Sequence, residues 1–449
     1  MTNPSSSIFP IRLTTRFALT AIALALTACG GGGDNDSNSN ITLSGSVSGL
    51  TGDGLILSDN GTTLSVAAGA TSFSFGTVSG SYDVTILAQP TNGTCSVVNG
   101  SGGSSNSVSS IQVQCRAYGV FVANQTGNSI AQFSIGSDGT LKAVAPATVV
   151  ADGAVTSLAA SGDGQHAWAN FSDSKSIANL VIGSDGTLST QSTYAQAASA
   201  GSSDSPLALA VSPDNKTLYA ANYGDASISV IGIGSNGLAT VPGAPMAPVA
   251  SGVNPFALAV TADGTRLYAT NQSDDTISGY DIGTGGGLTP LATAATSTTG
   301  QGTSPEGIVA NPNSATVYVT LADSAKLVAY SINPGTGVLT VKTSIATGTS
   351  PHGLAVTPAG TFLYVTNYGA ATVSEYSLAG GVLTSLGSVA AGSHPNGVSI
   401  SPDGKFAYVT NNADATISQY SIGSSGVLAP LSPATVPSGG LGPVGIIVR

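Results

Sequence analysis

Charged side chains are scarce in this chain of 449 residues. Asp, Glu, Lys and Arg make up 7% of the sequence, and 22 acidic side chains face 11 basic ones. The formal net charge of −11 argues against nucleic acid, polyphosphate and anionic lipid as partners. Long stretches with apolar residues at 3.6-residue spacing are also missing, which excludes a fold built on amphipathic helices.

Histidine and cysteine are equally rare, with 3 residues of each. No His or Cys pair stands at the spacing of a metal-ligand motif, so the sequence predicts neither a metal centre nor a cofactor. Glycine, in contrast, occurs 59 times, and Ser and Thr are abundant. This composition predicts an all-β fold of short strands joined by tight turns.

The first 28 residues have the pattern of a secretory signal. Arg12 and Arg16 precede a short apolar run, residues 17–26, which is too short to span a bilayer. The tetrapeptide Leu-Thr-Ala-Cys that ends at Cys29 resembles the bacterial lipobox, in which the cysteine is lipidated. This resemblance implies an exported lipoprotein that meets the membrane through its lipid anchor alone, with residues 29–40 as a flexible tether. An ordinary signal peptide that leaves Cys29 free is the alternative.

Residues 41–116 form a separate segment of short alternating runs separated by turn signals. The pattern predicts a small antiparallel β-sandwich of the immunoglobulin-like kind. Cys95 and Cys115 remain as a pair in an exported chain, and we expect a disulfide between them. Closing a loop of about twenty residues contributes roughly 3 kcal/mol to the stability of such a domain.

A four-residue phrase then recurs along residues 117–449. Its first residue is aromatic, its last is most often Asn, and successive copies start 44 to 51 residues apart. Self-similarity at this period is typical of a β-propeller, in which each repeat is one four-stranded blade. The clearest copies begin at Tyr219, Tyr268, Tyr364 and Tyr408, and weaker ones at Phe121, Trp168 and Tyr318.

The two ends of the repeat region complement each other. The first copy starts at a second strand, residues 118–124, and the last contains only a first strand, residues 442–448. The sequence therefore predicts a seven-bladed propeller in which the N-terminal and C-terminal strands complete one blade. Such closure removes free sheet edges that would otherwise favour aggregation.

The repeats resemble the Tyr-Val-Thr-Asn family of seven-bladed propellers and, more broadly, the propeller-fold lactonase superfamily. The resemblance covers residues 118–449. That superfamily includes 6-phosphogluconolactonases and carboxymuconate cyclases, so the resemblance implies a hydrolase that opens a small lactone.

In a propeller, the loops that lead into the innermost strands meet at one mouth of the central channel. Alignment of the repeats places one residue of each blade there: Thr156, Leu207, Phe256, Glu306, His352, Asn396 and Val444. The predicted ring is asymmetric. Glu306, His352 and Asn396 come from consecutive blades, whereas Leu207 and Phe256 supply an apolar wall. His394 shares a loop with Asn396, and Tyr223 and Tyr368 face the same mouth.

These residues suit lactone hydrolysis. His352 can activate water or protonate the leaving alkoxide, Glu306 can orient it, and Asn396 can donate to the developing oxyanion. Phe256, Leu207, His394, Tyr368 and Tyr223 are the candidate ligand-binding residues. None of the seven mouth residues is basic, and Lys326 is a single cation on the same face, so a phosphorylated substrate is disfavoured.

Two alternatives stay open. The polar residues can be solvated rim residues of a non-catalytic propeller that binds a small molecule or an envelope protein. They can also hold a metal through Glu306, His352 and His394, although no ligand-spacing motif supports this. The fold alone does not decide, because propellers host both enzymes and binding proteins.

Overall fold

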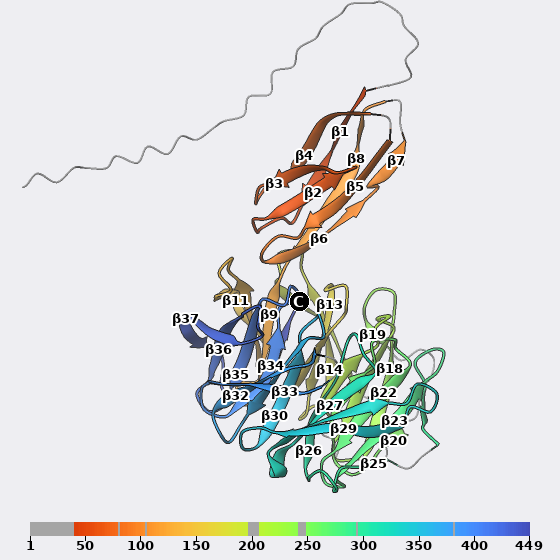
Figure 1. The fold of residues 1–449 in the computed structure, drawn as a ribbon, viewed down its shortest axis with the longest axis vertical. Coiled ribbons are helices and arrows are strands. Elements are labelled where there is room, and N and C mark those ends of the chain that lie inside the picture. Colours follow the sequence, from red (N-terminus) through yellow and green to blue (C-terminus); the bar gives the residue numbers. More distant parts are fainter. Residues whose placement is uncertain are drawn as a thin grey trace, which may run out of the picture. The chain divides into compact units, whose positions relative to one another are not determined.

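The computed structural model describes residues 40–79, 81–103, 106–195, 206–240, 248–292, 295–379 and 382–449 (Figure 1). The predicted signal, Cys29 and the tether up to residue 39 lie outside the described residues. Within the described ranges the structure is almost entirely β, with a short 3₁₀ turn, η1 (Ala322–Ser324), in blade 5. None of the helices described has the length and apolar character needed to cross a membrane.

The N-terminal region contains two four-stranded sheets. The first runs β4 (Ser72–Ser79), β1 (Asn40–Ser48), β8 (Val108–Ala117) and β6 (Gly93–Val98). The second runs β3 (Thr62–Val66), β2 (Leu55–Asp59), β5 (Ser81–Ala88) and β7 (Ser101–Gly103). Most neighbouring strands are antiparallel, but β1 and β8 pair in parallel.

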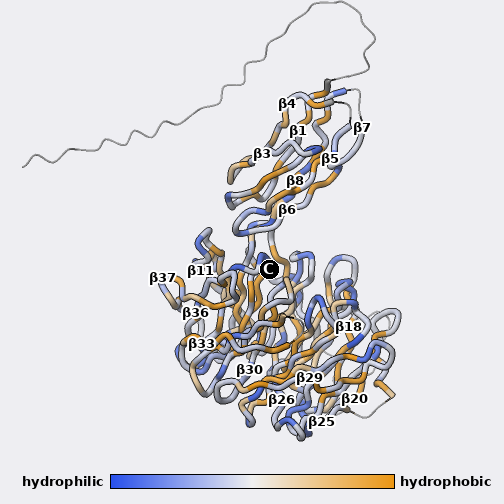
Figure 2. Tube along the Cα trace, viewed as in Figure 1, coloured by the Kyte–Doolittle hydropathy of each residue, from blue (hydrophilic) through white to orange (hydrophobic). Residues whose placement is uncertain are grey.

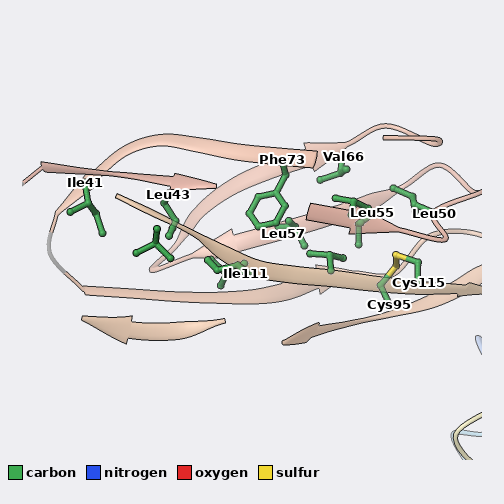
Figure 3. Packing of buried hydrophobic residues seen from close by; sticks show 14 residues of the cluster. Ile41, Leu43, Leu50, Leu55, Leu57, Val66, Phe73, Cys95, Ile111 and Cys115 are labelled. Carbon is green, nitrogen blue, oxygen red and sulfur yellow. A yellow bond between two sulfur atoms is a disulfide. The ribbon is translucent and has the colours of Figure 1, made fainter. Parts of the chain in front are cut away.

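Both sheets contribute to one apolar core (Figure 3). Leu43, Leu55, Leu57 and Ile111 have no exposed surface, and Phe73 lies among them. Alternate residues of β2 are buried, as expected for a strand with one face toward a core.

The expected disulfide is present between Cys95 and Cys115. The two cysteines are register partners on the adjacent strands β6 and β8, so the bond joins strands of one sheet. Both side chains belong to the buried core of the region.

Seven further sheets among the described residues are the blades of a propeller, numbered here in chain order. Blade 1 contains β38 (Pro443–Val448), β9 (Gly119–Asn124), β10 (Ser129–Ile135) and β11 (Leu141–Val150), and blade 2 contains β12 (Val155–Ala160), β13 (His166–Phe171), β14 (Ser176–Ile182) and β15 (Leu188–Ala195). Blade 3 contains β16 (Pro206–Val211), β17 (Thr217–Asn222), β18 (Ser227–Ile233) and β19 (Ala239–Thr240), with β20 (Val249–Ala250) also paired to β18. Blade 4 contains β21 (Pro255–Val260), β22 (Arg266–Asn271), β23 (Thr276–Ile282) and β24 (Leu288–Pro290), with β25 (Thr296–Ser297) also paired to β23.

The last three blades follow the same order of strands. Blade 5 contains β26 (Pro305–Ala310), β27 (Thr316–Leu321), β28 (Lys326–Ile332) and β29 (Leu339–Ala346). Blade 6 contains β30 (Pro351–Val356), β31 (Phe362–Asn367), β32 (Thr372–Ser377) and β33 (Thr384–Ala390). Blade 7 contains β34 (Pro395–Ile400), β35 (Phe406–Asn411), β36 (Thr416–Ile422) and β37 (Leu428–Pro437).

The predicted closure of the ring is confirmed. β38, the last strand of the chain, pairs antiparallel with β9, the first strand of the repeat region, and Ile446 lies opposite Val122. The C-terminus therefore lies beside β9 (Figure 1). Ile446 and Val448 are buried in a core shared with β9, β10 and blade 7, so the closing strand is also a packing element.

Turns follow the inner strands of blades 2 to 7. In blade 7 the turn at residues 402–404 joins β34 to β35. Asp403 Oδ1 accepts hydrogen bonds from the Ser401 hydroxyl (2.5 Å) and the Lys405 amide (3.1 Å). Gly404 has a φ of 72°, in the left-handed region that glycine adopts without steric cost. Figure 2 shows the resulting pattern, with hydrophobic residues along the strands and hydrophilic ones gathered in turns.

The tyrosine of the repeat joins neighbouring blades. Its ring is buried on the second strand, and its hydroxyl donates to a glycine carbonyl in the last turn of the next blade. This bond measures 2.7 Å from Tyr408 to Gly139, and the same contact occurs at Tyr219, Tyr268 and Tyr364. A hydrogen bond of this kind contributes about 1 kcal/mol net to folding.

The threonine and asparagine of the repeat hold the loops at the channel mouth. Thr366 Oγ1 donates to the carbonyl of Asn396 in the next blade (2.6 Å), and Thr320 Oγ1 donates to that of His352 (2.9 Å). Asn367 donates to two hydroxyl groups of the third strand and accepts the Gly348 amide. The repeat therefore fixes the position of the mouth residues, whose side chains are free to differ.

Candidate functional site at the channel mouth

The inner strands of all seven blades surround one cavity of about 360 Å³. Six of the seven predicted mouth residues line it: Thr156, Leu207, Phe256, His352, Asn396 and Val444. The seventh, Glu306, is buried, with its side chain 8% exposed, and reaches the cavity through a contact with His352. The alignment of repeats thus locates the mouth correctly.

The backbone of the mouth is the same in most blades. In blade 1 and blades 4 to 7, the residue before the proline that opens the inner strand has a positive φ, as at Asn254 (57°), Ser350 (49°) and His394 (55°). Its carbonyl accepts the amide of the residue after the repeat asparagine, for example Tyr368 to Ser350 and Asn412 to His394. Because this frame is shared, the differences between the loops lie in their side chains.

His352 and Glu306 form the polar centre of the mouth. His352 Nε2 lies 2.9 Å from Glu306 Oε2, and the two side chains are 22% and 8% exposed. With Nε2 directed at the carboxylate, Nδ1 is the ring nitrogen left to accept a proton from a ligand or from water. The pair joins blade 6 to blade 5, and such an oriented imidazole can move protons to and from a ligand.

A second contact holds Glu306 from its other side. Gln272 Nε2 donates to Glu306 Oε1 (2.8 Å), and Gln272 Oε1 accepts the Tyr223 hydroxyl (2.8 Å). Both carboxylate oxygens of Glu306 are therefore directed, one toward Gln272 and one toward His352. The result is a chain of polar contacts from Tyr223 in blade 3 to His352 in blade 6.

Aromatic rings form an arc along the same blades. Phe256 meets Tyr223 and His352 edge to face, with ring centroids 6.4 Å and 5.7 Å apart. Tyr368 stacks between the two histidines, 5.2 Å from His352 and 4.4 Å from His394. The arc supports the imidazole of His352 on both sides and fixes its plane.

Comparison with known families and structures agrees with this architecture. The sequence model of the family described as Lactonase, 7-bladed beta-propeller, matches residues 144–441, about two thirds of the chain. The chain belongs to this lactonase family. A comparison with curated proteins gave no match.

Solved structures similar to this lactonase-family chain share its fold. A putative 6-phosphogluconolactonase from Bacteroides uniformis is 18% identical with a TM-score of 0.63, and the alignment covers 74% of this chain and 99% of that one. The periplasmic gluconolactonase PpgL from Pseudomonas aeruginosa is 19% identical with a TM-score of 0.62, with coverage of 74% and 98%. A putative 6-phosphogluconolactonase from Bacteroides fragilis is 19% identical with a TM-score of 0.61.

The cations of this lactonase-family propeller lie away from the cavity lining. No described residue that lines the cavity is Lys or Arg. Lys326, the cation expected on the mouth face, donates to the Gln301 carbonyl (2.7 Å). Arg266 pairs with Asp281 (2.7 Å) and Lys405 with Asp403 (3.4 Å) at the start of second strands.

Metal ligands do not converge at the mouth in the part of the chain that the structure describes. No group of three His, Cys, Asp or Glu side chains there is close enough to hold an ion. Tyr368 lies between His352 and His394, so the two imidazoles do not face each other directly.

Sequence reasoning missed Gln272 as part of the site. It follows the repeat asparagine Asn271, which is the same place in its blade that Tyr223 and Tyr368 occupy in theirs. The alignment that selected those two tyrosines could therefore have found Gln272. His166 and Trp168 lie in the blade frame: Trp168 has no exposed surface, and the His166 ring lies against Gly237.

Proposed function

We propose that this chain hydrolyses a small, uncharged lactone at the channel mouth, with His352 as the group that moves protons. The observation that carries the proposal is the His352–Glu306 pair, 2.9 Å apart, beside a cavity of about 360 Å³. A buried carboxylate that orients an imidazole at a ligand-sized cavity is a recurring arrangement in hydrolases.

The proposed reaction uses water as nucleophile. His352 Nδ1 takes a proton from water as the water oxygen forms a bond to the lactone carbonyl carbon. Glu306 stabilises the positive charge that develops on the imidazole, because its carboxylate contacts Nε2. The ring C–O bond then breaks, and the leaving alkoxide takes the proton back from Nδ1. The product is the open-chain hydroxy acid.

Asn396 is the proposed oxyanion donor. It lines the cavity in the blade next to His352, and its own carbonyl is held by Thr366. The side-chain amide can donate to the lactone oxygen as negative charge develops there. Removal of one such donor typically costs a factor of about 100 to 1,000 in kcat.

The absence of Lys and Arg from the described cavity lining supports an uncharged substrate. A phosphate or carboxylate would lose its hydration beside the buried Glu306 without gaining a cationic partner. The similar structures carry the names of a gluconolactonase and of putative 6-phosphogluconolactonases. We propose that this chain shares lactone opening with them and not the phosphorylated substrate.

Export, lipid anchoring and the identity of the N-terminal domain are also proposals. We propose that Cys29 carries a lipid and that the chain is exported and held at the cell envelope by this anchor. Residues 41–116 are then an immunoglobulin-like sandwich domain between the anchor and a propeller of the Tyr-Val-Thr-Asn repeat family. The disulfide between Cys95 and Cys115 supports an oxidising compartment.

A lactone panel followed by acid release tests the proposed activity. Wild type should open at least one uncharged lactone faster than the lactone opens in buffer alone. His352→Ala should lower kcat by a factor of about 100 or more. Cooperative unfolding of this variant should show that its fold is intact. His166→Gln, a histidine substitution away from the cavity, is the matched control and should keep the activity of wild type. A wild type that opens none of the lactones would leave the alternative, a non-catalytic propeller that binds a small molecule or an envelope protein.

A further inference from the structure

We infer that the substrate of this site is a lactone with an apolar alkyl substituent, and not a polyhydroxylated sugar lactone. The inference deepens the proposed function and rests on it, because it names the ligand that the same cavity accepts. The observation behind it is the chemistry of the channel wall below the His352–Glu306 pair.

Six of the seven inner strands contribute a large apolar side chain to the cavity lining. These side chains are Leu158, Leu207, Phe256, Leu354, Val398 and Ile446. The seventh inner strand, β26, contributes Gly307 instead. An alkyl chain in contact with this wall would leave water for an apolar surface, which is favourable by about 25 cal/mol per Å² of apolar area.

Two of the polar side chains in the lining already hold the propeller frame. Thr156 Oγ1 exchanges hydrogen bonds with Asn170, and Ser157 Oγ accepts the Leu209 amide (3.2 Å). The polar side chains that remain in the lining are His352, Asn396 and Gln125, from the consecutive blades 6, 7 and 1. The first two are the residues proposed to handle the lactone group itself.

A sugar lactone carries a hydroxyl group on nearly every carbon. Each hydroxyl that enters the cavity loses hydrogen bonds to water and needs a protein partner in exchange. Apart from the side chains that hold the frame, the lining offers polar side chains on one side only, at His352, Asn396 and Gln125. A lactone ring at those residues has polar partners, and an alkyl chain along the wall has apolar ones. The cavity volume of about 360 Å³ lies within the usual range for small-molecule sites.

The test compares kcat/KM for δ-gluconolactone with the series γ-butyrolactone, γ-hexalactone, γ-octalactone and γ-decalactone. We expect kcat/KM to rise about threefold to fourfold per added methylene until the chain outgrows the cavity, and to be lowest for δ-gluconolactone. Leu207→Asn should lower kcat/KM for γ-octalactone about tenfold, and by a larger factor than it lowers kcat/KM for γ-butyrolactone. Val427→Asn, at an exposed valine of blade 7 outside the lining (43% exposed), is the matched control and should leave all values unchanged.

Calorimetric titration of the same compounds separates this inference from the proposed activity. Alkyl lactones that bind without turnover would contradict the proposed hydrolysis and support the apolar site. Turnover of δ-gluconolactone at a higher kcat/KM than γ-octalactone would support hydrolysis and overturn the inference. A kcat/KM that does not depend on chain length, or a series in which no alkyl lactone binds, would overturn it as well.

Discussion

The bodies of the blades and the loops at the channel mouth follow opposite rules. In the bodies, the same residue types make the same contacts from blade to blade, as in the hydrogen bonds of Tyr219, Tyr268, Tyr364 and Tyr408 to the next blade. At the mouth, a shared backbone carries a different side chain in every blade. Repetition therefore marks the residues that build the ring, and its interruption marks the residues available for chemistry.

The largest expected effect tests the ring itself. Deletion of residues 443–449 removes β38 and leaves β9 without its inner partner. It also removes Ile446 and Val448 from the core between blades 1 and 7. We expect the truncated chain to lose cooperative unfolding of the propeller by calorimetry, since blade 1 loses its inner strand and part of its packing against blade 7 and exposes the edge of β9. A truncated chain that unfolds at the temperature of the full chain would contradict closure by the two ends.

A smaller expected effect tests whether contacts at the mouth contribute to activity independently of the stability of the ring. Gln272→Met keeps the length of the side chain and removes its hydrogen bonds to Glu306 and Tyr223. We expect kcat to fall about tenfold, because a hydrogen bond to a charged group contributes about 1.5 to 3 kcal/mol, while KM changes little. Gln114→Met on an exposed position of β8 is the control. An unchanged kcat in Gln272→Met would show that Glu306 needs no support from blade 4.

A substitution in a blade body should have the opposite effect and change stability without changing activity. Tyr408→Phe removes the hydrogen bond to Gly139 (2.7 Å) and should lower the free energy of unfolding by about 1 kcal/mol without changing activity. Tyr330→Phe is a matched control, because no described residue pairs with the buried Tyr330 hydroxyl. We expect its stability in urea to equal or exceed that of wild type. Equal losses in both variants would show that the hydrogen bond to the next blade adds nothing.

The smallest effect concerns a carboxylate in the blade body. Glu375 is buried and accepts the Leu428 amide of blade 7 (2.9 Å), the same role that Gln419 has toward Leu141. Burial raises the pKa of the Glu375 carboxyl, so the folded state binds this proton more tightly than the unfolded state. The contribution of Glu375 is therefore fully present at acidic pH and is lost as pH rises through its folded pKa.

Glu375→Gln removes this pH dependence and keeps an acceptor for Leu428. We expect the variant to unfold at a higher temperature than wild type at neutral pH, and at a similar temperature near pH 4, where an ordinary glutamate is largely protonated. Thermal unfolding at several pH values measures the difference. A variant that is less stable than wild type at neutral pH would contradict the assignment.

The repeat made the ring and the mouth predictable from sequence. Its period gives seven blades, and its ends show the shared blade. The strand bounds at the two ends of the ring are close to the predicted ones, 118–124 and 442–448, because the repeat phrase is a local signal: β9 spans Gly119–Asn124 and β38 spans Pro443–Val448. The residue after the opening proline then identifies five side chains that line the cavity, and the aligned position in blade 2, where Val155 replaces the proline, gives Thr156 as the sixth.

Contacts between blades were not predictable in the same way. Gln272 reaches Glu306, and Tyr368 stacks between His352 and His394, because neighbouring loops approach each other at the mouth. That approach depends on the angle between blades, which no local pattern encodes. The disulfide was predicted from the cysteine count, but its place between adjacent strands of one sheet depends on strand order, which turn signals do not determine.

The most direct test of the proposed site is a double-mutant cycle in kcat on a lactone that wild type opens. His352→Ala, Glu306→Gln and the double variant are compared, with cooperative unfolding checked for each. If the carboxylate acts only through the imidazole, the double variant should be no slower than His352→Ala alone. Losses that simply add, or a His352→Ala variant as active as wild type, would contradict a catalytic His352–Glu306 pair.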